Sequence, residues 1–481
     1  MKKVLIWTAS IILFIELLDT TILYACFVPI ADDFGISSSR MSLPVLSYIV
    51  GTCIFIPMVS WISNRFNKIN IIINTLVAFS IFSLLCSISK DLYIFSIFRF
   101  LQGAAISIAG SMTIIILLSV CKSEEIVKTM GTINIPALLG TAIGPLVGAI
   151  FSYYLSWRIA FFINFPVCVV IALSLIRLRS DPMFCSKPEL TIKKFDWLGF
   201  MLISVFLIMT SIGFEQLSSA INPINLFLIL SGIIFGVVYV IIWRQRLHSK
   251  QNNSILDLSV FRNTDFLFGT IVNIIARSAM CGVPVLLSII IQQLYGFSVI
   301  KAGFYLAIIA VAGIIAKFLS SFIKTIGVHQ TIAISSILTS LSIASLSLHE
   351  FWISNGCLWI PCFLLGFTMS LLYTSMNSVM YLTLKKNEIP NASNIGSIIQ
   401  QFGIGAGVVA AVGGFQFLAS LDSISFQIGG IQTHMANAFQ MICYLLAVLM
   451  MFNLIIAIPF QFLYKKNFSI DDKIEANLGY E

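Results

Sequence analysis

Long apolar runs alternate with short polar segments along nearly the whole chain. The runs reach about 20 residues or more, the length that a helix needs to cross roughly 30 Å of hydrocarbon. Because apolar residues are continuous within each run, the pattern favours helices over the alternating strands of an outer-membrane barrel. It predicts fourteen membrane-spanning helices, at about residues 4–30, 42–63, 69–89, 92–120, 129–155, 159–178, 197–215, 223–243, 266–293, 301–320, 328–348, 354–383, 394–420 and 437–463.

Composition and charge indicate an all-α integral membrane protein and predict its orientation. Of the 481 residues 58% are apolar and 10% charged, and the mean hydropathy is +1.00, which is more apolar surface than a soluble core could bury. With a cytoplasmic N-terminus, 22 of the 28 Lys and Arg residues fall in cytoplasmic segments, four fall outside and two lie inside spans. Short cytoplasmic loops normally hold this excess. Both termini are therefore predicted in the cytoplasm, and the net charge of +8 reflects topology rather than nucleic-acid binding.

Several other classes of protein find no support. The first apolar run is too long for a secretory signal and contains carboxylates, so we expect a retained helix. The ten cysteines show no metal-binding spacing, and most lie in spans. The sequence contains no HExxH or GxSxG motif and no phosphate-cradling loop, and its four histidines lie near span ends or in loops. We expect no enzyme activity, no metal and no cofactor.

Two longer polar loops, "RLRSDPMFCSKPELTIKKFD" and "RQRLHSKQNNSILDLSVFRN", divide the spans into six, two and six. Equal outer blocks indicate an internal duplication, an arrangement that in transporters places the substrate site near the midplane between the halves. The predicted units are an N-terminal six-helix bundle, a linker with two inserted helices, and a C-terminal six-helix bundle with a short cytoplasmic tail, at residues 1–180, 181–262 and 263–481.

Small residues at four-residue spacing occur in corresponding spans of the two outer blocks. This spacing places them on one helix face, where a second helix can approach closely. Each stripe alone is equally well explained by ordinary membrane packing, but their matched positions favour a repeat. The stripes are Gly140, Gly144 and Gly148 in the first block, and Gly403, Gly407 and Ala411 in the second.

Two carboxylates, Glu16 and Asp19, lie inside the first predicted span. A charge at the centre of the bilayer costs at least about 2.5–3.5 kcal/mol, so an ionisable group there usually has a function. The two residues share one helix face and resist being ionised together, which suits one of them to exchanging a proton. Asp19 lies about 16 Å from the end of its span, near the middle. The alternative is a structural carboxylate, permanently neutral or hydrogen-bonded to a neighbouring helix.

Two arginines also lie inside spans. Arg99 lies about two turns below the predicted outer surface, so it either extends to the lipid headgroups or pairs with an acid inside the bundle. Arg277 lies 11 residues into its span, too deep to reach the headgroups easily. If the halves are related, Arg277 lies at nearly the depth of Asp19. We therefore hypothesise that Asp19 and Arg277 face each other across a central cavity, as a gate pair or as substrate contacts.

Six motifs, in order along nearly the whole chain, resemble the major facilitator superfamily and specifically its fourteen-helix drug:proton antiporters of the EmrB/QacA type (MdtD/HsrA-like). "LLDTTILYACFVPIADDFG" is similar to the first-helix motif, with Asp19 in the acidic position. "SWRIAFFINFP", "QQLYGFSVIKAGF" and "YTSMNSVMYLTL" resemble later signatures of this subfamily. "RFLQG" and "LLGTAIGPLVGAI" resemble the motifs of helices 4 and 5, carried here by Arg99, Gln102, Gly103, Gly140, Gly144, Pro145 and Gly148.

The resemblance implies a major facilitator fold: two bundles around a central cavity that opens to each side in turn. It also implies that Asp19 and Arg99 take part in proton coupling. The span at 129–155 would be kinked at Pro145, pack across the domain interface and favour antiport. Proline removes a backbone hydrogen bond and glycines permit close, sliding contact, so the implied roles are physically reasonable.

The chain departs from the family pattern in the loop between the second and third spans. That motif has the form G-x-L-x-D-R-x-G-R, but the segment here reads "SWISNRFNK". Ser60, Asn64 and Asn67 replace Gly, Asp and Gly, whereas Arg65 and Lys68 remain. The missing acid is a charge that the family uses as a cytoplasmic latch, so altered gating is expected.

Other departures fall in the first and fourth spans. Tyr24 replaces a common Asn, Val28 occupies the usual Pro position, and Ser111 and Ile114 stand where Pro and Arg are expected. These positions bear on the substrate more than on the fold. The charge of the substrate is open at this stage, since two acids and two arginines cancel.

The leading hypothesis is a proton-coupled exporter of amphipathic small molecules in a bacterial inner membrane. Its expected partners are the small-molecule substrate, protons and the lipid bilayer, but no nucleic acid, and a monomer is the starting assumption. A dedicated metabolite or siderophore transporter and a transport-silent membrane sensor are the alternatives. The candidate residues are Asp19, Glu16 and Arg99 for proton coupling; Arg277, Gln102 and Tyr24 for the cavity and gating; the helix 5 motif; and Asn64, Arg65 and Lys68 in the loop.

Overall fold

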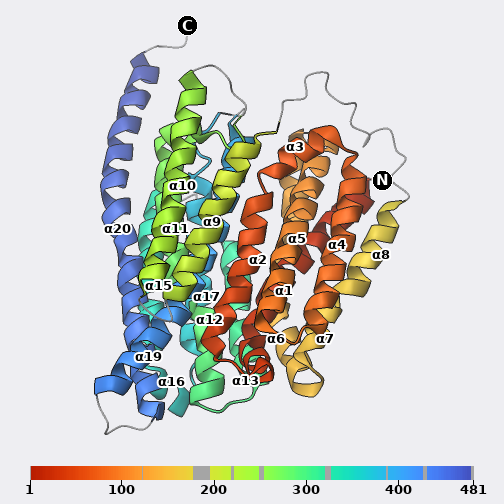
Figure 1. Ribbon diagram of the computed structural model, residues 1–481. Helices are drawn as coiled ribbons and strands as arrows, with labels where there is room; N and C mark the ends of the chain where they lie inside the picture. Colours follow the sequence, from red (N-terminus) through yellow and green to blue (C-terminus); the bar gives the residue numbers. More distant parts are fainter. Residues whose placement is uncertain are drawn as a thin grey trace.

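Long helices running side by side make up most of the structure (Figure 1). The computed structural model describes residues 2–121, 123–176, 195–217, 222–248, 254–319, 327–385, 388–425 and 431–477, and it has no β-strand within these ranges. The first helix begins and the last helix ends at the same end of the bundle (Figure 1). We call that end the terminal face and the opposite end the distal face. The predicted all-α class is confirmed.

The first group of helices encloses most of a hydrophobic core, which also takes in a few residues of later helices, among them Leu207 and Val285. At the distal face the rings of Phe34, Phe95 and Trp157 meet edge to face within this core. The group comprises α1 (Lys2–Phe34), η1 (Ser38–Met41), α2 (Ser42–Phe55), α3 (Met58–Arg65), α4 (Lys68–Ile88), α5 (Leu92–Val120), α6 (Ser123–Tyr154), α7 (Trp157–Phe162) and α8 (Asn164–Ile176).

A second core lies mostly among the helices of the last group, and Ala25 and Ala149 of the first group join it. Pro284 lies in the first turn of α12, where a proline lacks no hydrogen bond that the helix needs. The group comprises η2 (Leu258–Arg262), α11 (Thr264–Met280), α12 (Val283–Ile289), η3 (Ile290–Leu294), α13 (Val299–Phe318), α15 (Val328–Leu346), α16 (His349–Ser354), α17 (Trp359–Val379), α18 (Ile389–Val408), η5 (Val409–Gly413), α19 (Gly414–Ser425) and α20 (Ile431–Asn477).

Short polar side chains fix the starts of several helices. The carboxylate of Asp91 accepts hydrogen bonds from two backbone amides in the first turn of α5. Asn67 and Asn263 accept one such bond each at the starts of α4 and α11. These side chains satisfy amides that have no partner within the helix, a contribution of typically about 1 kcal/mol each. Asn67, which replaces a family glycine, therefore serves as a helix cap.

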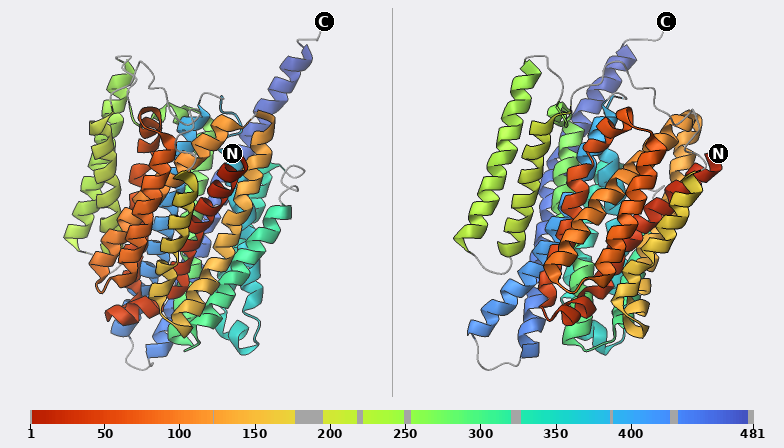
Figure 2. Two further views of the ribbon diagram at one scale, coloured as in Figure 1. Left: turned by 90° about the vertical axis from the view of Figure 1, so that its right-hand side faces the viewer. Right: turned by 45° about the vertical axis from the view of Figure 1, so that its right-hand side comes forward.

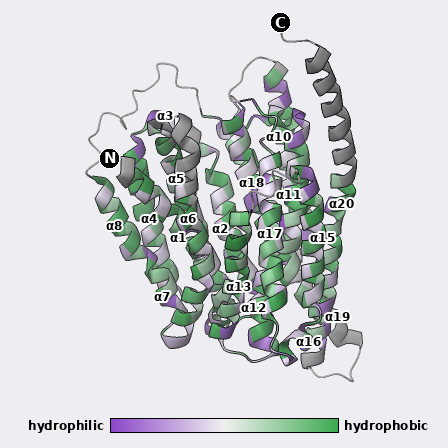
Figure 3. Ribbon diagram, turned by 180° about the vertical axis from the view of Figure 1, so that it is seen from behind, coloured by the Kyte–Doolittle hydropathy of each residue, from purple (hydrophilic) through white to green (hydrophobic). Residues whose placement is uncertain are grey.

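Eleven helical segments of the described chain are long and apolar enough to cross a membrane, and they coincide with eleven of the fourteen predicted spans. The other three predicted spans are helical too. The span at 42–63 is divided into α2 and α3 next to Pro57, α6 contains a shorter apolar segment, Leu138–Tyr154, among its described residues, and α15 is rich in Ser and Thr. Hydrophobic residues predominate along the helices, as a membrane environment requires (Figure 3). The count of fourteen stays a prediction.

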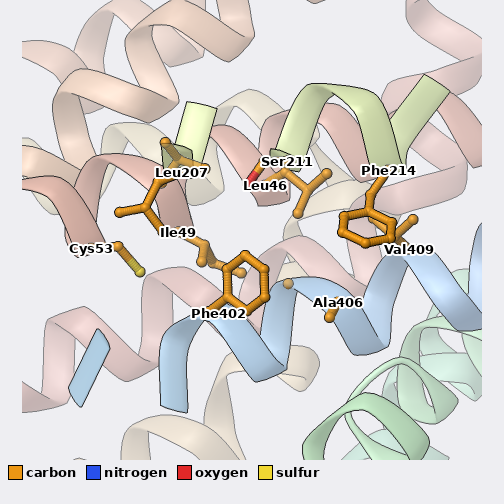
Figure 4. A pocket seen from close by; sticks show the side chains of 11 residues that line it. Leu46, Ile49, Cys53, Leu207, Ser211, Phe214, Phe402, Ala406 and Val409 are labelled. Atoms are coloured by element: carbon orange, nitrogen blue, oxygen red, sulfur yellow. The ribbon is translucent and has the colours of Figure 1, made fainter. Parts of the chain in front are cut away.

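The inserted pair, α9 and α10, forms a hairpin along one side of the molecule (Figure 2). α9 contacts both groups of helices: the Phe200 ring lies 6.2 Å from the Phe55 ring of α2, and Phe206 stacks on Phe402 of α18 at 6.5 Å. A small apolar gap of about 20 Å³ lies where α9 meets both α2 and α18 (Figure 4), and a larger cavity of about 380 Å³ lies between α9, α2 and α5. The hairpin therefore covers one seam between the two groups. Its bounds are Trp197–Leu217 for α9 and Pro223–His248 for α10.

The predicted domain boundaries are not resolved by this arrangement. Residue 180 lies outside the described residues, as does most of the first polar loop. The second boundary, at residue 262, coincides with the end of η2. The division into residues 1–180, 181–262 and 263–481 stays a prediction.

The glycine stripe of α6 packs directly on α1. A Cβ atom on Gly140 would lie 2.5 Å from the backbone oxygen of Phe14, and one on Gly148 would lie 2.7 Å from that of Ile22. Gly144, between them, is equally close to α1. Only glycine permits backbones to approach this closely.

The corresponding stripe of α18 packs on α11 and α12 in the same way. A Cβ on Gly407 would lie 2.4 Å from the backbone oxygen of Arg277, and one on Gly282 would lie 2.5 Å from the Cβ of Ala411. Gly403 contacts the side chain of Arg277. α11 is the predicted counterpart of α1, and α18 that of α6. The matched contacts support the predicted duplication.

A second pair of close helix contacts also occurs at corresponding places in the two predicted halves. A Cβ on Gly103 of α5 would lie 2.1 Å from the backbone oxygen of Tyr48 on α2. A Cβ on Gly366 of α17 would lie 1.9 Å from that of Ile309 on α13. The two helix pairs hold equivalent places in the predicted halves. Gly103, the last residue of "RFLQG", is thus needed for helix packing.

Candidate functional site

Asp19 and Arg99 form a buried ion pair in the first group of helices. One Nη of Arg99 donates to the Asp19 carboxylate over 2.6 Å, and each side chain is only 1% exposed. α1 supplies the acid and α5 the base, and the two residues lie on facing sides of these packed helices. Arg99 therefore does not extend to the headgroups. A charge this deep in apolar surroundings is tolerated because its partner compensates it.

Neutral polar side chains complete the surroundings of the carboxylate. Asn164 donates to Asp19 over 2.7 Å and Gln102 does so over 3.1 Å. Both amides also donate to the hydroxyl of Ser83, which donates onward to the backbone oxygen of Phe161. The network joins α1, α4, α5 and α8, so a change in the charge of Asp19 acts on four helices at once.

Aromatic rings surround the guanidinium of Arg99. Its central carbon lies 4.3 Å from the centre of the Tyr48 ring and 5.5 Å from that of Phe161. Arg99 also donates to Gln102 over 2.8 Å, whereas its Nε finds no acceptor among the described residues. Because Asp19 is the only anion bonded to this cation in the described structure, the charge of Arg99 is compensated only while Asp19 is ionised.

Glu16 lies apart from this network. An added Cβ on Gly110 of α5 would approach its carboxylate to 3.1 Å, so Glu16 packs against the middle of that helix. Glu16 is partly buried, and no cation of the described residues pairs with it. The structure thus places one predicted proton-coupling acid in an ion pair and the other without one.

The hypothesised pair of Asp19 and Arg277 is not formed, and this is a correction. Asp19 is bonded to Arg99, whereas the partners of Arg277 are neutral: its Nε donates to Asn273 over 2.6 Å and one Nη donates to Gln400 over 3.2 Å. The rotation of α1 turns Asp19 into the first group of helices. Depth along the two helices was similar, but depth alone does not determine which face carries a side chain.

Arg277 and Tyr24 line a cavity of about 300 Å³ between the two groups of helices. Its walls come from α1, α6, α11, α12, α13, α17 and α18, and they are mostly apolar. The Arg277 guanidinium lies 4.5 Å from the centre of the Tyr373 ring, which also lines the cavity. Gln102, predicted as a cavity residue, is instead fully buried in the Asp19 network.

On the distal side of the cavity the two groups of helices contact each other. On the first group, Pro145 and Ala149 of α6 lie so close to α13 that a Cβ on Gly303 would fall 2.5 Å from the Cβ of Ala149. Further out, Gln293 donates to the hydroxyl of Ser38 over 2.8 Å. α6 thus packs across the interface as predicted, but through Pro145 and Ala149, whereas its glycines face α1. The helix continues through Pro145 without a break.

The loop motif lies at the turn between α3 and α4. Asn64 and Arg65 are exposed, and Lys68 is partly exposed. The guanidinium of Arg65 lies 5.2 Å from the centre of the Trp61 ring, a cation–π contact. Trp61 in turn packs on Phe195 at 5.0 Å, just before α9. Within the described residues, Asn64, Arg65 and Lys68 form no ion pair.

Several residues of these two sites were missed in the sequence. Asn164 lies in the quoted segment "SWRIAFFINFP", and a polar side chain inside an apolar span was the available signal. Ser83, Asn273 and Gln400 gave a similar but weaker signal, because Ser, Asn and Gln often serve helix packing in membranes. Tyr373 could not be distinguished from the many aromatic residues that contact lipid.

Comparisons with known proteins agree with this architecture. The probable transport protein HsrA of Haemophilus influenzae is 27% identical over 413 residues, which cover 85% of this chain and 86% of that protein. The putative multidrug resistance protein MdtD of Escherichia coli is 24% identical over 417 residues, 84% of each chain.

Solved structures share the fold at low sequence identity. A bacterial homologue of the human lysosomal transporter Spinster, in an inward-facing and occupied conformation, matches with a TM-score of 0.63 at 14% identity and covers 96% of each chain. The nucleoside transporter NupG matches with a TM-score of 0.60 at 13% identity, over 96% of this chain and 99% of that chain. The sequence profile of the Major Facilitator Superfamily matches residues 9–408. This chain belongs to the Major Facilitator Superfamily.

Proposed function

We propose that this protein is a proton-coupled exporter of amphipathic small molecules that works by alternating access. The observation that carries the proposal is the double role of α1. One face of this helix holds Asp19 in the buried ion pair, and another face, with Thr20 and Tyr24, lines the central cavity. A proton on Asp19 and a substrate in the cavity would therefore act on the same helix.

The ion pair supplies a reason for protonation to change the conformation. A proton on Asp19 removes the charge that compensates Arg99, and the hydrogen bonds from Gln102 and Asn164 must then rearrange. A ligand shifts an equilibrium between two conformations only if it binds them with different affinity. The hydrogen-bond network around Asp19 joins four helices, so its proton affinity would differ between two arrangements of those helices. The rocking of two bundles around a central site is the usual response in this class of transporter.

The nature of the substrate is supported by the relatives and by the cavity. MdtD is named a putative multidrug resistance protein and HsrA a probable transport protein. The walls of the cavity are mostly apolar, with a few polar groups such as Tyr24 and Ser370. Apolar walls with few polar groups suit amphipathic molecules of varied shape.

We further propose that the terminal face lies in the cytoplasm of a bacterial inner membrane. The excess of Lys and Arg in the predicted cytoplasmic segments supports this orientation. The relatives from Haemophilus influenzae and Escherichia coli support a bacterial membrane. In this orientation the contact between Pro145 and Gly303 lies on the outer side of the cavity.

Everted membrane vesicles provide the test. A pH-gradient dye is quenched by respiration, and amphipathic probes are then added to vesicles with and without the protein. We expect probe-dependent recovery of fluorescence only in vesicles that contain the protein, because an antiporter releases protons as it takes up substrate. Absence of recovery across cationic, neutral and anionic probes, with the protein present and folded, would contradict antiport. A dedicated exporter would respond to few probes rather than many.

Asn164 gives a more specific prediction. Asn164→Ala removes the 2.7 Å donor from Asp19, and a hydrogen bond to a charged group contributes about 1.5–3 kcal/mol. If coupling loses that interaction energy, the rate of probe-driven proton release should fall roughly tenfold or more. The control is Asn74→Ala, the same change at an exposed position of α4. Equal rates in the two variants would remove Asn164 from the coupling network.

A further inference from the structure

Counted over the described residues, the wall of the central cavity carries one charge, and its sign is positive. Among the described residues that line it, Arg277 is the one basic or acidic side chain; the others are apolar, hydroxyl, thiol or tyrosine groups. The sequence left this sign open, because two acids and two arginines inside the spans cancel. Which of them pair decides the sign, and the structure shows the pairing.

The acids of the first span do not neutralise Arg277. Asp19 is bonded to Arg99, and both are buried away from the cavity. Glu16 is not among the described residues that line the cavity, and its carboxylate packs against Gly110 of α5. Arg277 belongs to none of the three ion pairs in which both partners are described residues.

Neutral groups hold the guanidinium of Arg277 in place. Asn273 accepts from its Nε, Gln400 accepts from one Nη, and the Tyr373 ring faces it at 4.5 Å. Asn273 is itself oriented by a 2.9 Å hydrogen bond to Asn377. Arginine has five N–H donors, so these two bonds leave donors for a ligand. The side chain is thus positioned in advance, and preorganised donors bind anions strongly.

An uncompensated arginine at this depth is costly unless something neutralises it. Arg277 is 7% exposed, yet no carboxylate of the described residues lies beside it. In membranes such residues usually mark the path of a substrate or an ion. A ligand carboxylate or sulfonate would supply the missing charge, and the planar guanidinium matches either group with two parallel hydrogen bonds.

We propose that the substrate of this cavity is an amphipathic organic monoanion. Its carboxylate or sulfonate binds Arg277, and its apolar body lies against Tyr24, Leu306, Ile309 and Met369. The inference deepens the proposed function, since it names the substrate class of the same site. It also makes a cation a poor ligand, because a cation would lie against Arg277.

Three probes that share one ring system test the charge preference: 2-naphthoate, 2-naphthamide and 2-naphthylmethylammonium. Dissociation constants are measured on the full-length purified protein. We expect wild type to bind 2-naphthoate at least about tenfold more tightly than 2-naphthamide, because one hydrogen bond between charged groups contributes enough free energy for that difference. The ammonium probe should bind most weakly. Arg277→Gln should abolish the preference, and Arg277→Lys should keep part of it.

The control is Arg244→Gln, the same substitution at an exposed position of α10, which should leave all three dissociation constants unchanged. If Arg277→Gln does not fold, the ranking of the three dissociation constants in wild type and in Arg277→Lys tests the inference instead. The inference is overturned if wild type fails to bind 2-naphthoate, if it prefers the ammonium probe, or if the preference survives in Arg277→Gln.

The anion site and proton antiport can be tested independently of each other. Binding of 2-naphthoate through Arg277 without proton release in vesicles would contradict antiport and leave the anion site intact. Proton release driven by the ammonium probe, with no binding of 2-naphthoate, would support antiport and overturn the anion site.

Discussion

Asp19→Asn is expected to abolish probe-driven proton release, and it should also destabilise the protein. The substitution removes the only acid bonded to Arg99 in the described structure and leaves a guanidinium that is 1% exposed without a counter-ion. Removing one partner of a buried ion pair typically costs about 3–5 kcal/mol. The vesicle assay measures the first effect, and the melting temperature in detergent measures the second.

A double-mutant cycle separates coupling from stability. Arg99→Gln should also be destabilising, because it leaves the Asp19 carboxylate buried beside neutral amides. The double variant Asp19→Asn with Arg99→Gln should be more stable than the sum of the single changes predicts, since no unpaired charge remains. Proton release should stay absent in the double variant, because restored packing does not restore a titratable group.

The control for this cycle is Asp33→Asn, the same change on the same helix. Asp33 pairs with Arg158 over 2.5 Å, but its side chain is 41% exposed. Exposed ion pairs are typically worth about 0–1 kcal/mol, so this variant should melt near the wild-type temperature and retain transport. Proton release that persists in Asp19→Asn would remove Asp19 from the coupling role, and Glu16→Gln would then be the variant to measure.

Gly366→Ala is expected to lower the melting temperature by several degrees and to impair transport. The added Cβ would lie 1.9 Å from the backbone oxygen of Ile309, whereas carbon atoms pack at about 3.5–4.0 Å. A backbone oxygen cannot move aside as a flexible side chain does, so α13 and α17 must separate. Overpacking typically costs about 1–3 kcal/mol, and the separation would also reshape the cavity wall that these helices form.

Gly313→Ala, on α13 in the same helix pair, provides the matched control. Its Cβ would meet nothing closer than the backbone oxygen of Gly366 at 3.5 Å, an ordinary contact. Alanine favours a helix over glycine by about 1 kcal/mol, so this variant should be as stable as wild type or slightly more so. Equal melting temperatures for Gly366→Ala and Gly313→Ala would show that the two helices do not pack as closely as the structure indicates.

The sequence spacing of charged residues did not predict which side chains they contact. Glu16 and Asp19 lie three residues apart, which predicts a shared helix face, yet one carboxylate is held by Arg99 and the other packs near Gly110. Asp19 and Asn164 are 145 residues apart and meet at 2.7 Å. Nothing local in the sequence relates them, because their contact depends on how α1 and α8 are rotated and packed.

Motifs predicted positions better than contacts. "RFLQG" contains both Arg99 and Gln102, and the structure places both in the buried network, whereas Gln102 was expected on the cavity wall. The glycines of α6 were expected at the domain interface, yet they face α1, and Pro145 makes the interface contact. A helix surface has several faces, and the pattern of small residues shows that one face is closely packed without showing against which neighbour.

The sequence alone determined the membrane character of this protein, most of its spans, its all-α class and its family resemblance. These follow from one-dimensional properties, because the bilayer demands apolar runs of fixed length whatever their neighbours are. Only the tertiary structure decided that Asp19 pairs with Arg99 and that Arg277 remains as the charge on the cavity wall. Pairing of charges depends on helix rotation and on packing between distant segments, and both are settled only when all the helices are in place.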